Sequence, residues 1–169
     1  MEPILEIENI SLQFGGVKAL DSVTYHINQG EIFSLIGPNG AGKTSMLNCI
    51  SGLYQPTTGS IRYKGQEIIN MKPYNRTTLG MARAFQNIAL SAHMSVLDNL
   101  KLGRHSLMKE GIFSGGLYVG KASKEEIDHR QKVEEVIEFL DLQDIRHTPV
   151  GTLSYGLQKR VEVGRALAL

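Results

Sequence analysis

Apolar and polar residues alternate along the N-terminal part of the chain, as they do in strands with one buried face. This alternation predicts two early strands, the first carrying Leu5, Ile7, Ile10 and Leu12 and the second carrying Val23, Tyr25 and Ile27. Turn signals at residues 15–16 and 28–30 bound these strands. Residues 32–36 are nearly all apolar, which predicts a short strand covered on both faces, and Ile61 and Tyr63 mark a later strand.

Helical spacing replaces the alternation after residue 86. Ser95 with Asp98, and Ser123 with Glu126, match the capping box, in which a hydroxyl and a carboxylate satisfy the first N–H groups of a helix. The second of the two predicted helices carries an apolar stripe at Ile127, Val133, Val136, Ile137 and Leu140. A stripe at this spacing predicts packing against a core.

Composition excludes several classes of protein. Hydrophobic residues make up 41% and charged residues 21% of the 169, as in ordinary globular domains. The net charge is +1 and no basic tract is present, so no nucleic-acid partner is expected. Cys49 is the single cysteine, no run approaches the roughly 20 apolar residues that cross a bilayer, and the acidic N-terminus does not resemble a signal peptide. We expect a soluble, cytoplasmic chain.

One motif carries clear chemistry. It matches the phosphate-binding pattern GxxxxGK[ST] and consists of Gly37, Pro38, Asn39, Gly40, Ala41, Gly42, Lys43 and Thr44. Glycines let successive N–H groups turn toward one anion, Lys43 supplies a charge for the β- and γ-phosphates, and Thr44 offers a hydroxyl to Mg²⁺. A helix is predicted to follow, with Gly52 as its C-cap.

A glycine-rich turn without a ligand is the alternative interpretation of this motif. Its position between a buried-type strand and a helix favours nucleotide binding, and Ser45 next to Thr44 is assigned to the same site. The loop does not identify the class of nucleotide-binding protein, because kinases, GTPases, helicases and ABC ATPases all share it.

Further segments resemble motifs of the ATP-binding cassette (ABC) ATPases. Residues 153–162, which begin Leu-Ser-Tyr-Gly, resemble the signature motif usually written LSGGQ, and residues 83–86 resemble the Q-loop. Phe14 lies where that family places an aromatic residue under adenine. With the phosphate-binding loop, these motifs occur in the family's order over nearly the whole chain, and the chain is identified as a member of the family.

The resemblance implies a fold and a division of the chain. The expected fold is α/β, a P-loop NTPase of the ABC ATPase type with an N-terminal antiparallel β subdomain, a P-loop core and a helical subdomain, incomplete at the C-terminus. Residues 1–86 are expected to hold the nucleotide-binding core and residues 87–169 the helical subdomain with the signature motif.

The resemblance also implies a role for each residue. Phe14 stacks on adenine, and Gln86 joins Thr44 as a Mg²⁺ ligand. Ser154, Tyr155 and Gly156 face the γ-phosphate of an ATP bound by the opposite subunit. Without the family motifs, a core residue is an equally good interpretation of Phe14. Gln86 would be interpreted as a solvated side chain, and Ser154 with Gly156 as an ordinary cap and turn.

Two positions depart from the LSGGQ pattern: Tyr155 replaces the first Gly and Leu157 replaces the Gln. The tyrosine, together with residues 13–20 and the insertion between residues 103 and 123, resembles the ATP-binding subunits of branched-chain amino-acid importers. That resemblance implies ATP and Mg²⁺ as cofactors, a second ATP-binding subunit and transmembrane permease subunits as partners, and a peripheral position on the inner face of the cell membrane.

In this family a hydrophobic strand with a catalytic Asp-Glu pair and a later switch histidine follow the signature helix. The sequence ends at Leu169, before that strand would begin, and none of its five histidines is placed as the switch. We therefore expect no catalytic residue in this chain, no ATP turnover by it alone, and an exposed apolar edge at residues 32–36. A soluble ABC ATPase outside transport and a binding-only nucleotide module are the alternative functions, and the sequence does not identify the transported solute.

Overall fold

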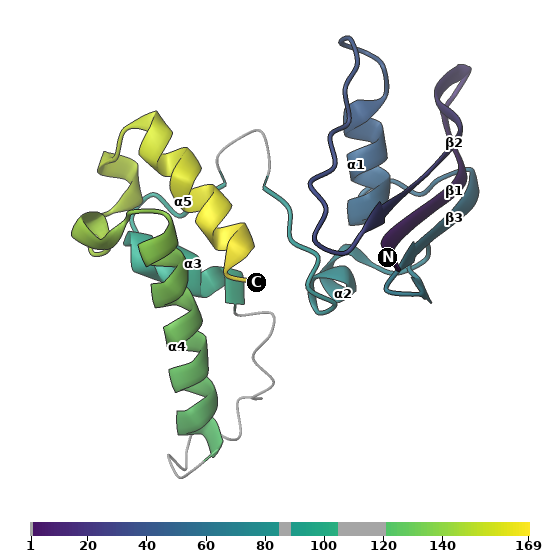
Figure 1. Cartoon of the computed structure of the whole chain (residues 1–169). Coiled ribbons are helices and arrows are strands. Elements are labelled where there is room, and N and C mark those ends of the chain that lie inside the picture. Colours follow the sequence, from purple (N-terminus) through teal and green to yellow (C-terminus); the bar gives the residue numbers. More distant parts are fainter. Residues whose placement is uncertain (1, 85–88, 105–120) are drawn as a thin grey trace. The chain divides into compact units, whose positions relative to one another are not determined.

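The computed structural model describes residues 2–84, 89–104 and 121–169, with the backbone alone over 121–126. The chain divides into two compact units, Met1–Leu79 and Gly80–Leu169. The first holds a sheet and two helices and the second holds helices (Figure 1). None of the described helices is both long and apolar enough to pass through a membrane.

The first unit is built on a four-stranded antiparallel sheet with the order β2-β1-β3-β4. Its strands are β1 (Pro3–Phe14), β2 (Val17–Asn28), β3 (Thr58–Tyr63) and β4 (Gln66–Glu67). The strands predicted from alternation are confirmed, and so is the turn at residues 15–16, which joins Phe14 to Val17 in a tight hairpin.

The apolar alternation in β1 changes phase halfway, from odd positions at Leu5 and Ile7 to even positions at Ile10 and Leu12, yet all of these side chains are buried. The pairing with β2 shifts register between Ile7 and Ile10, and Asn9 has a φ of +50°. An irregularity of this kind adds a residue to one strand and turns the following side chains back to the core face. The Thr24 hydroxyl accepts a hydrogen bond from Asn9 N at 2.9 Å and holds the irregularity in place.

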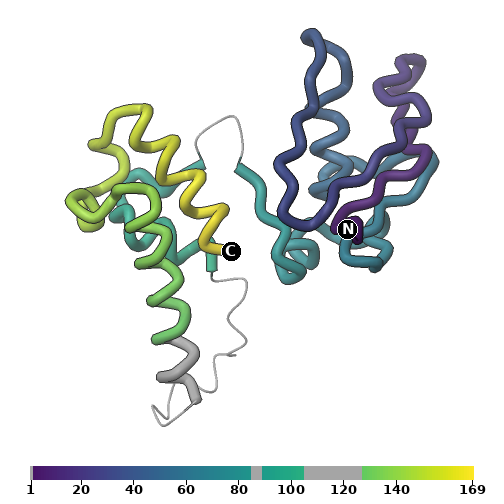
Figure 2. The backbone as a smooth tube through the Cα atoms, viewed as in Figure 1, coloured from purple at the N-terminus to yellow at the C-terminus, as the bar shows by residue number. Residues whose placement is uncertain are grey.

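Helix α1 (Lys43–Ser51) packs on this sheet through Met46 and Cys49, both buried, and ends at Gly52 in the left-handed conformation, as predicted. The short helix α2 (Pro73–Thr77) completes the unit. Figure 2 follows the backbone from the hairpin through residues 31–42 into α1.

The prediction of a strand at residues 32–36 is wrong for this structure. These residues belong to no strand, and Ile32 and Ile36 are 97% and 90% exposed. A strand requires a hydrogen-bonded neighbour, and the described part of the chain supplies none for this segment. Phe33 instead stacks on Tyr25 of β2, with ring centroids 5.0 Å apart and an interplanar angle of 6°. The expected strand edge is therefore absent, although Ile32 and Ile36 are exposed.

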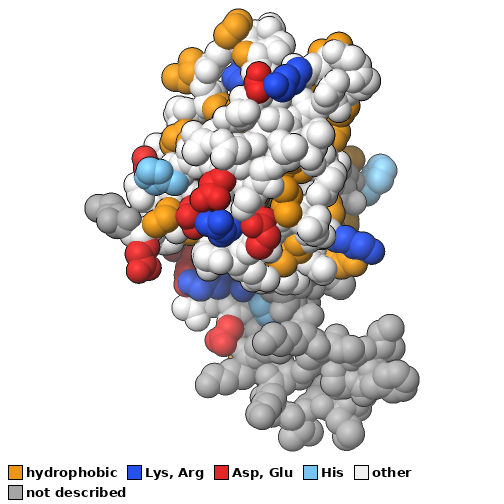
Figure 3. Space-filling view, turned by 90° about the vertical axis from the view of Figure 1, so that its right-hand side faces the viewer, with side chains coloured by type: hydrophobic (Ala, Val, Ile, Leu, Met, Phe, Trp, Pro, Cys, Tyr) orange, Lys and Arg blue, Asp and Glu red, His pale blue; other side chains and the backbone are white. Residues whose placement is uncertain are grey.

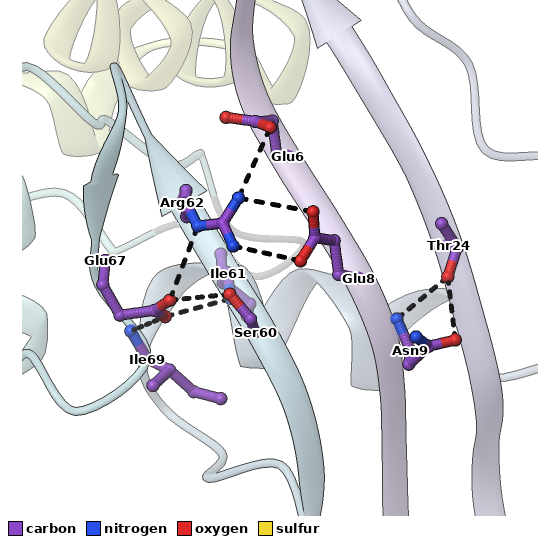
Figure 4. Close-up of polar contacts among 9 residues, drawn as sticks. All are labelled: Glu6, Glu8, Asn9, Thr24, Ser60, Ile61, Arg62, Glu67 and Ile69. Carbon is purple, nitrogen blue, oxygen red and sulfur yellow. Dashed lines mark hydrogen bonds and ion pairs between the residues drawn. The ribbon is translucent and has the colours of Figure 1, made fainter.

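A network of charged side chains covers part of the sheet around Arg62 (Figure 4). The guanidinium donates to both carboxylate oxygens of Glu8, at 3.3 and 3.2 Å, and lies 3.7 Å from Glu6 and 4.0 Å from Glu67. Glu67 accepts further hydrogen bonds from the Ser60 hydroxyl at 2.6 Å and from the backbone N–H groups of residues 61 and 69. On the face shown in Figure 3, acidic and basic side chains are interspersed.

The second unit contains α3 (Val96–Arg104), α4 (Lys121–Phe139), the 3₁₀ turns η2 (Gln143–Ile145) and η3 (Val150–Thr152), and α5 (Tyr155–Leu167). Its core consists of side chains from all three helices and the turns between them: Val96, Leu97, Leu100, Val133, Ile137, Leu142, Val150 and Val161. The apolar stripe of α4 is confirmed at Val133 and Ile137, with Val136 and Leu140 packed at the margin of this core.

Other helix predictions have mixed outcomes. The capping box at Ser95 is confirmed, because its hydroxyl accepts from Asp98 N at 3.1 Å and donates to the Asp98 carboxylate at 2.6 Å. Ile127 is 61% exposed, so its assignment to the apolar stripe is wrong. The helix start at Ser123 is also wrong, because α4 begins at Lys121; lysine and alanine are strong helix formers and extend the helix by a fraction of a turn.

The network in Figure 4 predicts a pH dependence of stability. Burial alone would raise the pKa of Glu67, but the hydrogen bonds from Ser60, Ile61 and Ile69 and the charge of Arg62 lower it below its ordinary value. A carboxyl with a depressed pKa contributes stability above the pKa of the unfolded chain and loses that contribution as the pH falls through the folded-state pKa. Glu67→Gln should therefore destabilise the protein at neutral pH, by less than about 1 kcal/mol since the side chain is half exposed, and the difference should shrink in acid.

NMR titration of the Glu67 carboxyl and urea unfolding between pH 3 and 7 measure these two quantities. Glu138→Gln, at an exposed position of α4, controls for removal of one negative charge. A Glu67 pKa at or above the value of a free glutamate would contradict the prediction.

Candidate nucleotide-binding site

The predicted phosphate-binding loop lies in the first unit, between the exposed segment 31–36 and the start of α1. Residues 37–41 are exposed, and a turn closes the loop through a hydrogen bond from Ala41 N to Pro38 O at 3.2 Å. Helix α1 begins directly after it, and its first hydrogen bond runs from Met46 N to Gly42 O at 2.9 Å. The strand predicted before the loop is absent, but the loop and the helix after it form as expected.

Lys43 folds back over this loop. Its ammonium group donates to Gly37 O at 2.6 Å and to Pro38 O at 2.7 Å, so the side chain closes the loop from within. An ammonium group carries three donors and no acceptor. The contact places the positive charge of Lys43 against the backbone of the loop. The sequence motif predicts that this same charge binds phosphate.

Position 42 requires a glycine for two reasons, its backbone conformation and the atoms around it. Its φ is +83°, where L side chains are strained, and a Cβ would lie 2.5 Å from Ala19 O and 2.9 Å from Leu20 Cδ2. The close approach brings the start of α1 against strand β2. The position of the loop relative to the sheet therefore depends on a residue without a side chain at this point.

No side chain of the described residues caps the N-terminus of α1. Gly42 occupies the N-cap position without a side-chain hydrogen bond, and no acidic residue lies in the first turn. The first N–H groups of a helix carry a partial positive charge, which favours an anion when no carboxylate or hydroxyl caps them. Thr44 is exposed and Ser45 half-buried, and both residues belong to the first turn, the end of the helix where an anion would bind.

Phe14, predicted to stack on adenine, is 47% exposed at the end of β1. Its ring meets Tyr54 edge-on, with centroids 5.1 Å apart and an interplanar angle of 77°. Sequence reasoning missed Tyr54. The signal available was a tyrosine two residues after the predicted C-cap Gly52. Two hydrogen bonds, from Leu53 N and Tyr54 N to Asn48 O, fold this segment back onto α1.

The signature residues lie in the second unit, at the start of α5. Ser154 occupies the N-cap position, but its hydroxyl makes no capping hydrogen bond. Tyr155 is 68% exposed, and beyond the neighbouring residues and the backbone of the same helix no described atom lies within 4 Å of the place where a Cβ of Gly156 would be. The Lys159 ammonium lies 5.9 Å from the centroid of the Tyr155 ring. This helix N-terminus is therefore open in the described structure.

Gln86, assigned as a Mg²⁺ ligand, lies outside the described residues, as does most of the insertion between residues 103 and 123. Within the described ranges, no group of three or more histidine, cysteine, aspartate or glutamate side chains is arranged to bind a metal ion. Magnesium at nucleotide sites is held by few protein ligands together with phosphate oxygens and water. The exposed Thr44 hydroxyl fits that limited role.

Fold and loop together define a P-loop nucleotide-binding class with an antiparallel β unit and a helical unit. A family model described as ABC transporter matches residues 20–169. The chain therefore belongs to the ABC transporter family.

Among curated relatives, the chain is 33% identical over 165 residues to the high-affinity branched-chain amino acid transport ATP-binding protein BraF of Pseudomonas aeruginosa, with 98% of this chain and 65% of that protein covered. It is 36% identical to the probable branched-chain amino acid transport ATP-binding protein LivG of Archaeoglobus fulgidus, over 97% of this chain and 63% of that one. The chain thus spans about two thirds of the length of these relatives, slightly less in each case.

Solved structures confirm the predicted fold class. A nucleotide-free ATP-binding cassette from an ABC transporter superposes with a TM-score of 0.79 at 35% identity, covering 99% of this chain and 65% of that one. The ADP conformation of MJ1267, an ATP-binding cassette of an ABC transporter, gives a TM-score of 0.80 at 35% identity with the same coverage.

The surroundings of Gly42 predict the effect of adding one methyl group there. Gly42→Ala combines a strained φ with a backbone clash, so we expect destabilisation by about 2 kcal/mol or more. Gly40→Ala is the matched control, because Gly40 also has a positive φ, of +86°, but open space around it; it should cost about 1 kcal/mol, the backbone strain alone. Urea unfolding of both variants measures the difference, and equal costs would contradict the proposed contact with β2.

Proposed function

We propose that this chain is the nucleotide-binding part of an ABC transporter subunit that couples ATP binding and hydrolysis by the whole protein to import of branched-chain amino acids or a related small solute. The observation that carries the proposal is the phosphate-binding loop, with Lys43 folded over it and an uncapped helix end behind it. The names of the relatives BraF and LivG support the class of solute.

Different residues of the first unit would bind different parts of the nucleotide. The Lys43 ammonium would exchange its two carbonyl partners for β- and γ-phosphate oxygens, an exchange that needs a rotation of the side chain and little movement of the loop. Backbone N–H groups of residues 39–40 and 42–44 and the positive end of α1 add to the attraction for the anion. The Thr44 hydroxyl would hold Mg²⁺ together with Gln86, and the half-exposed ring of Phe14 would stack on adenine.

The second unit would act on a different nucleotide. The open helix end at Ser154, Tyr155 and Gly156 would face the γ-phosphate of an ATP held by a second ATP-binding subunit, so that ATP is enclosed between two subunits. Under this proposal residues 1–86 serve as nucleotide-binding core and residues 87–169 as helical subdomain. Closure of the two subunits on ATP would drive transmembrane permease subunits, with the protein held at the inner face of the cell membrane.

Titration with Mg-ATP tests the proposal. Saturable binding is expected, and Lys43→Ala should weaken it by about ten- to a hundredfold, because a hydrogen bond to a charged group contributes about 1.5–3 kcal/mol. Isothermal calorimetry on the full-length protein measures both affinities.

Lys64→Ala removes an exposed lysine of the same unit, whose ammonium lies 5.1 Å from the centroid of the Tyr63 ring, and should leave the affinity unchanged. The absence of a saturable signal from the wild-type protein would reject the proposed function. Equal losses in the two lysine variants would show that Lys43 acts through overall charge and not through the loop.

A further inference from the structure

Arg76 of α2 is a charged side chain that is buried and takes no part in the site described above. It is 2% exposed, among the most deeply buried side chains of the first unit. Its guanidinium binds no carboxylate among the described residues and donates instead to backbone carbonyl oxygens. Burial lowers the pKa of Arg76, but a guanidinium starts so high that the group stays charged.

The carbonyl groups that Arg76 binds belong to separate segments. Two lie in the last turn of α1, Cys49 O at 2.8 Å and Ile50 O at 2.6 Å. The other two follow strand β4, Ile69 O at 3.1 Å and Met71 O at 2.9 Å. One planar group therefore joins the C-terminal end of the helix behind the phosphate-binding loop to the chain that leaves the sheet.

This contact meets a need that α1 cannot meet alone. The last carbonyl groups of a helix have no partner within it and carry a partial negative charge. The last turn of α1 contains no basic residue, and Arg76 brings the complementary charge from 26 residues further along the chain. Gly52 at the C-cap makes room for it, because a Cβ there would lie 2.9 Å from both Cζ and Nε of Arg76.

We propose that Arg76 is a positioning residue for the phosphate-binding loop, which fixes α1 at the end opposite to the loop while Gly42 fixes it at the loop. The inference rests on the proposed function of the loop in binding nucleotide. A helix of 9 residues moves as one rigid body of about 13 Å. Release of its C-terminal end therefore tilts the N-terminal amides and Lys43 away from a shared anion.

The experiment compares affinities for Mg-ATP and for inorganic tripolyphosphate in the full-length protein. Arg76→Gln should weaken both by about tenfold, the scale on which groups that orient a ligand-binding residue act elsewhere. Arg76→Lys should recover part of the loss, because an ammonium group can serve some of the carbonyls. Gly52→Ala, which displaces the guanidinium without removing it, should shift both affinities in the same direction.

Arg62→Gln is the matched control, because Arg62 lies in the same unit but binds carboxylates on the sheet surface. It should leave both affinities within about twofold, as expected for a surface change away from the site. All titrations are made at a temperature where circular dichroism shows each variant folded, and thermal midpoints are recorded separately.

If Arg76 had a purely structural role, its substitution would lower the thermal midpoint and leave both affinities of the folded variants unchanged. That result would overturn this inference but not the proposed function. Failure of all three variants to fold would also reject it, because Arg76 would then act on folding. Loss of ATP affinity without loss of tripolyphosphate affinity would show that Arg76 acts on binding of the nucleoside and not of the phosphates, and would also contradict the inference. Absence of binding in the wild type would reject the proposed function itself.

Discussion

A helix cannot satisfy its own ends, and the first unit depends on how α1 meets this constraint. Its amide end has no side-chain cap among the residues that the structure describes, and it meets the sheet through Gly42, which approaches Ala19 closely. Its carbonyl end is satisfied by a guanidinium from α2 and by N–H groups of residues 52–54. The asymmetry leaves the amide end available to an anion outside the chain while the other end is neutralised within it.

The need of the backbone for hydrogen-bond partners also explains why an apolar segment lies on the surface. Residues 32–36 have the composition of a buried strand, but apolar composition supplies no hydrogen-bond partner for the backbone. A strand in the interior needs neighbours on both edges, and the sheet of this unit ends at β2 on one side and β4 on the other. The segment is exposed along its whole length, and the stack of Phe33 on Tyr25 recovers part of the apolar contact.

Local patterns determined how well the sequence predicted the fold. The hairpin, the helix after the phosphate-binding loop and the capping box at Ser95 each depend on residues close together in the chain, and each was predictable. The irregularity at Asn9 was visible as a change of phase between Ile7 and Ile10, although its geometry depends on the pairing with β2. The solved structures bear out the fold class, which rested on motifs in order along the chain.

Long-range contacts explain what the sequence did not predict. In the sequence, nothing distinguishes Arg76 from the other basic residues. Its four carbonyl partners are distributed over two segments that only folding brings together. Tyr54 likewise becomes the neighbour of Phe14 only after residues 53–54 bond back to Asn48. Ile127 matched a helical stripe, but a stripe specifies a direction around the helix and does not specify how far along it the neighbouring helices reach.

Glycines in the two candidate anion sites differ in the reason for their presence. Gly42 is explained within the chain, by its φ and by the oxygen of Ala19. Gly156 has neither reason, because its φ is not positive and a Cβ there would meet open space. A glycine inside a helix costs about 1 kcal/mol relative to alanine, and nothing in the described structure offsets that cost.

An anion that approaches the backbone of Gly156 closely from outside would offset this cost, because the lack of a side chain then shortens the distance to the N–H groups. Tyr155 beside it can carry a large side chain, since that side chain extends into solvent and leaves the approach to Gly156 open.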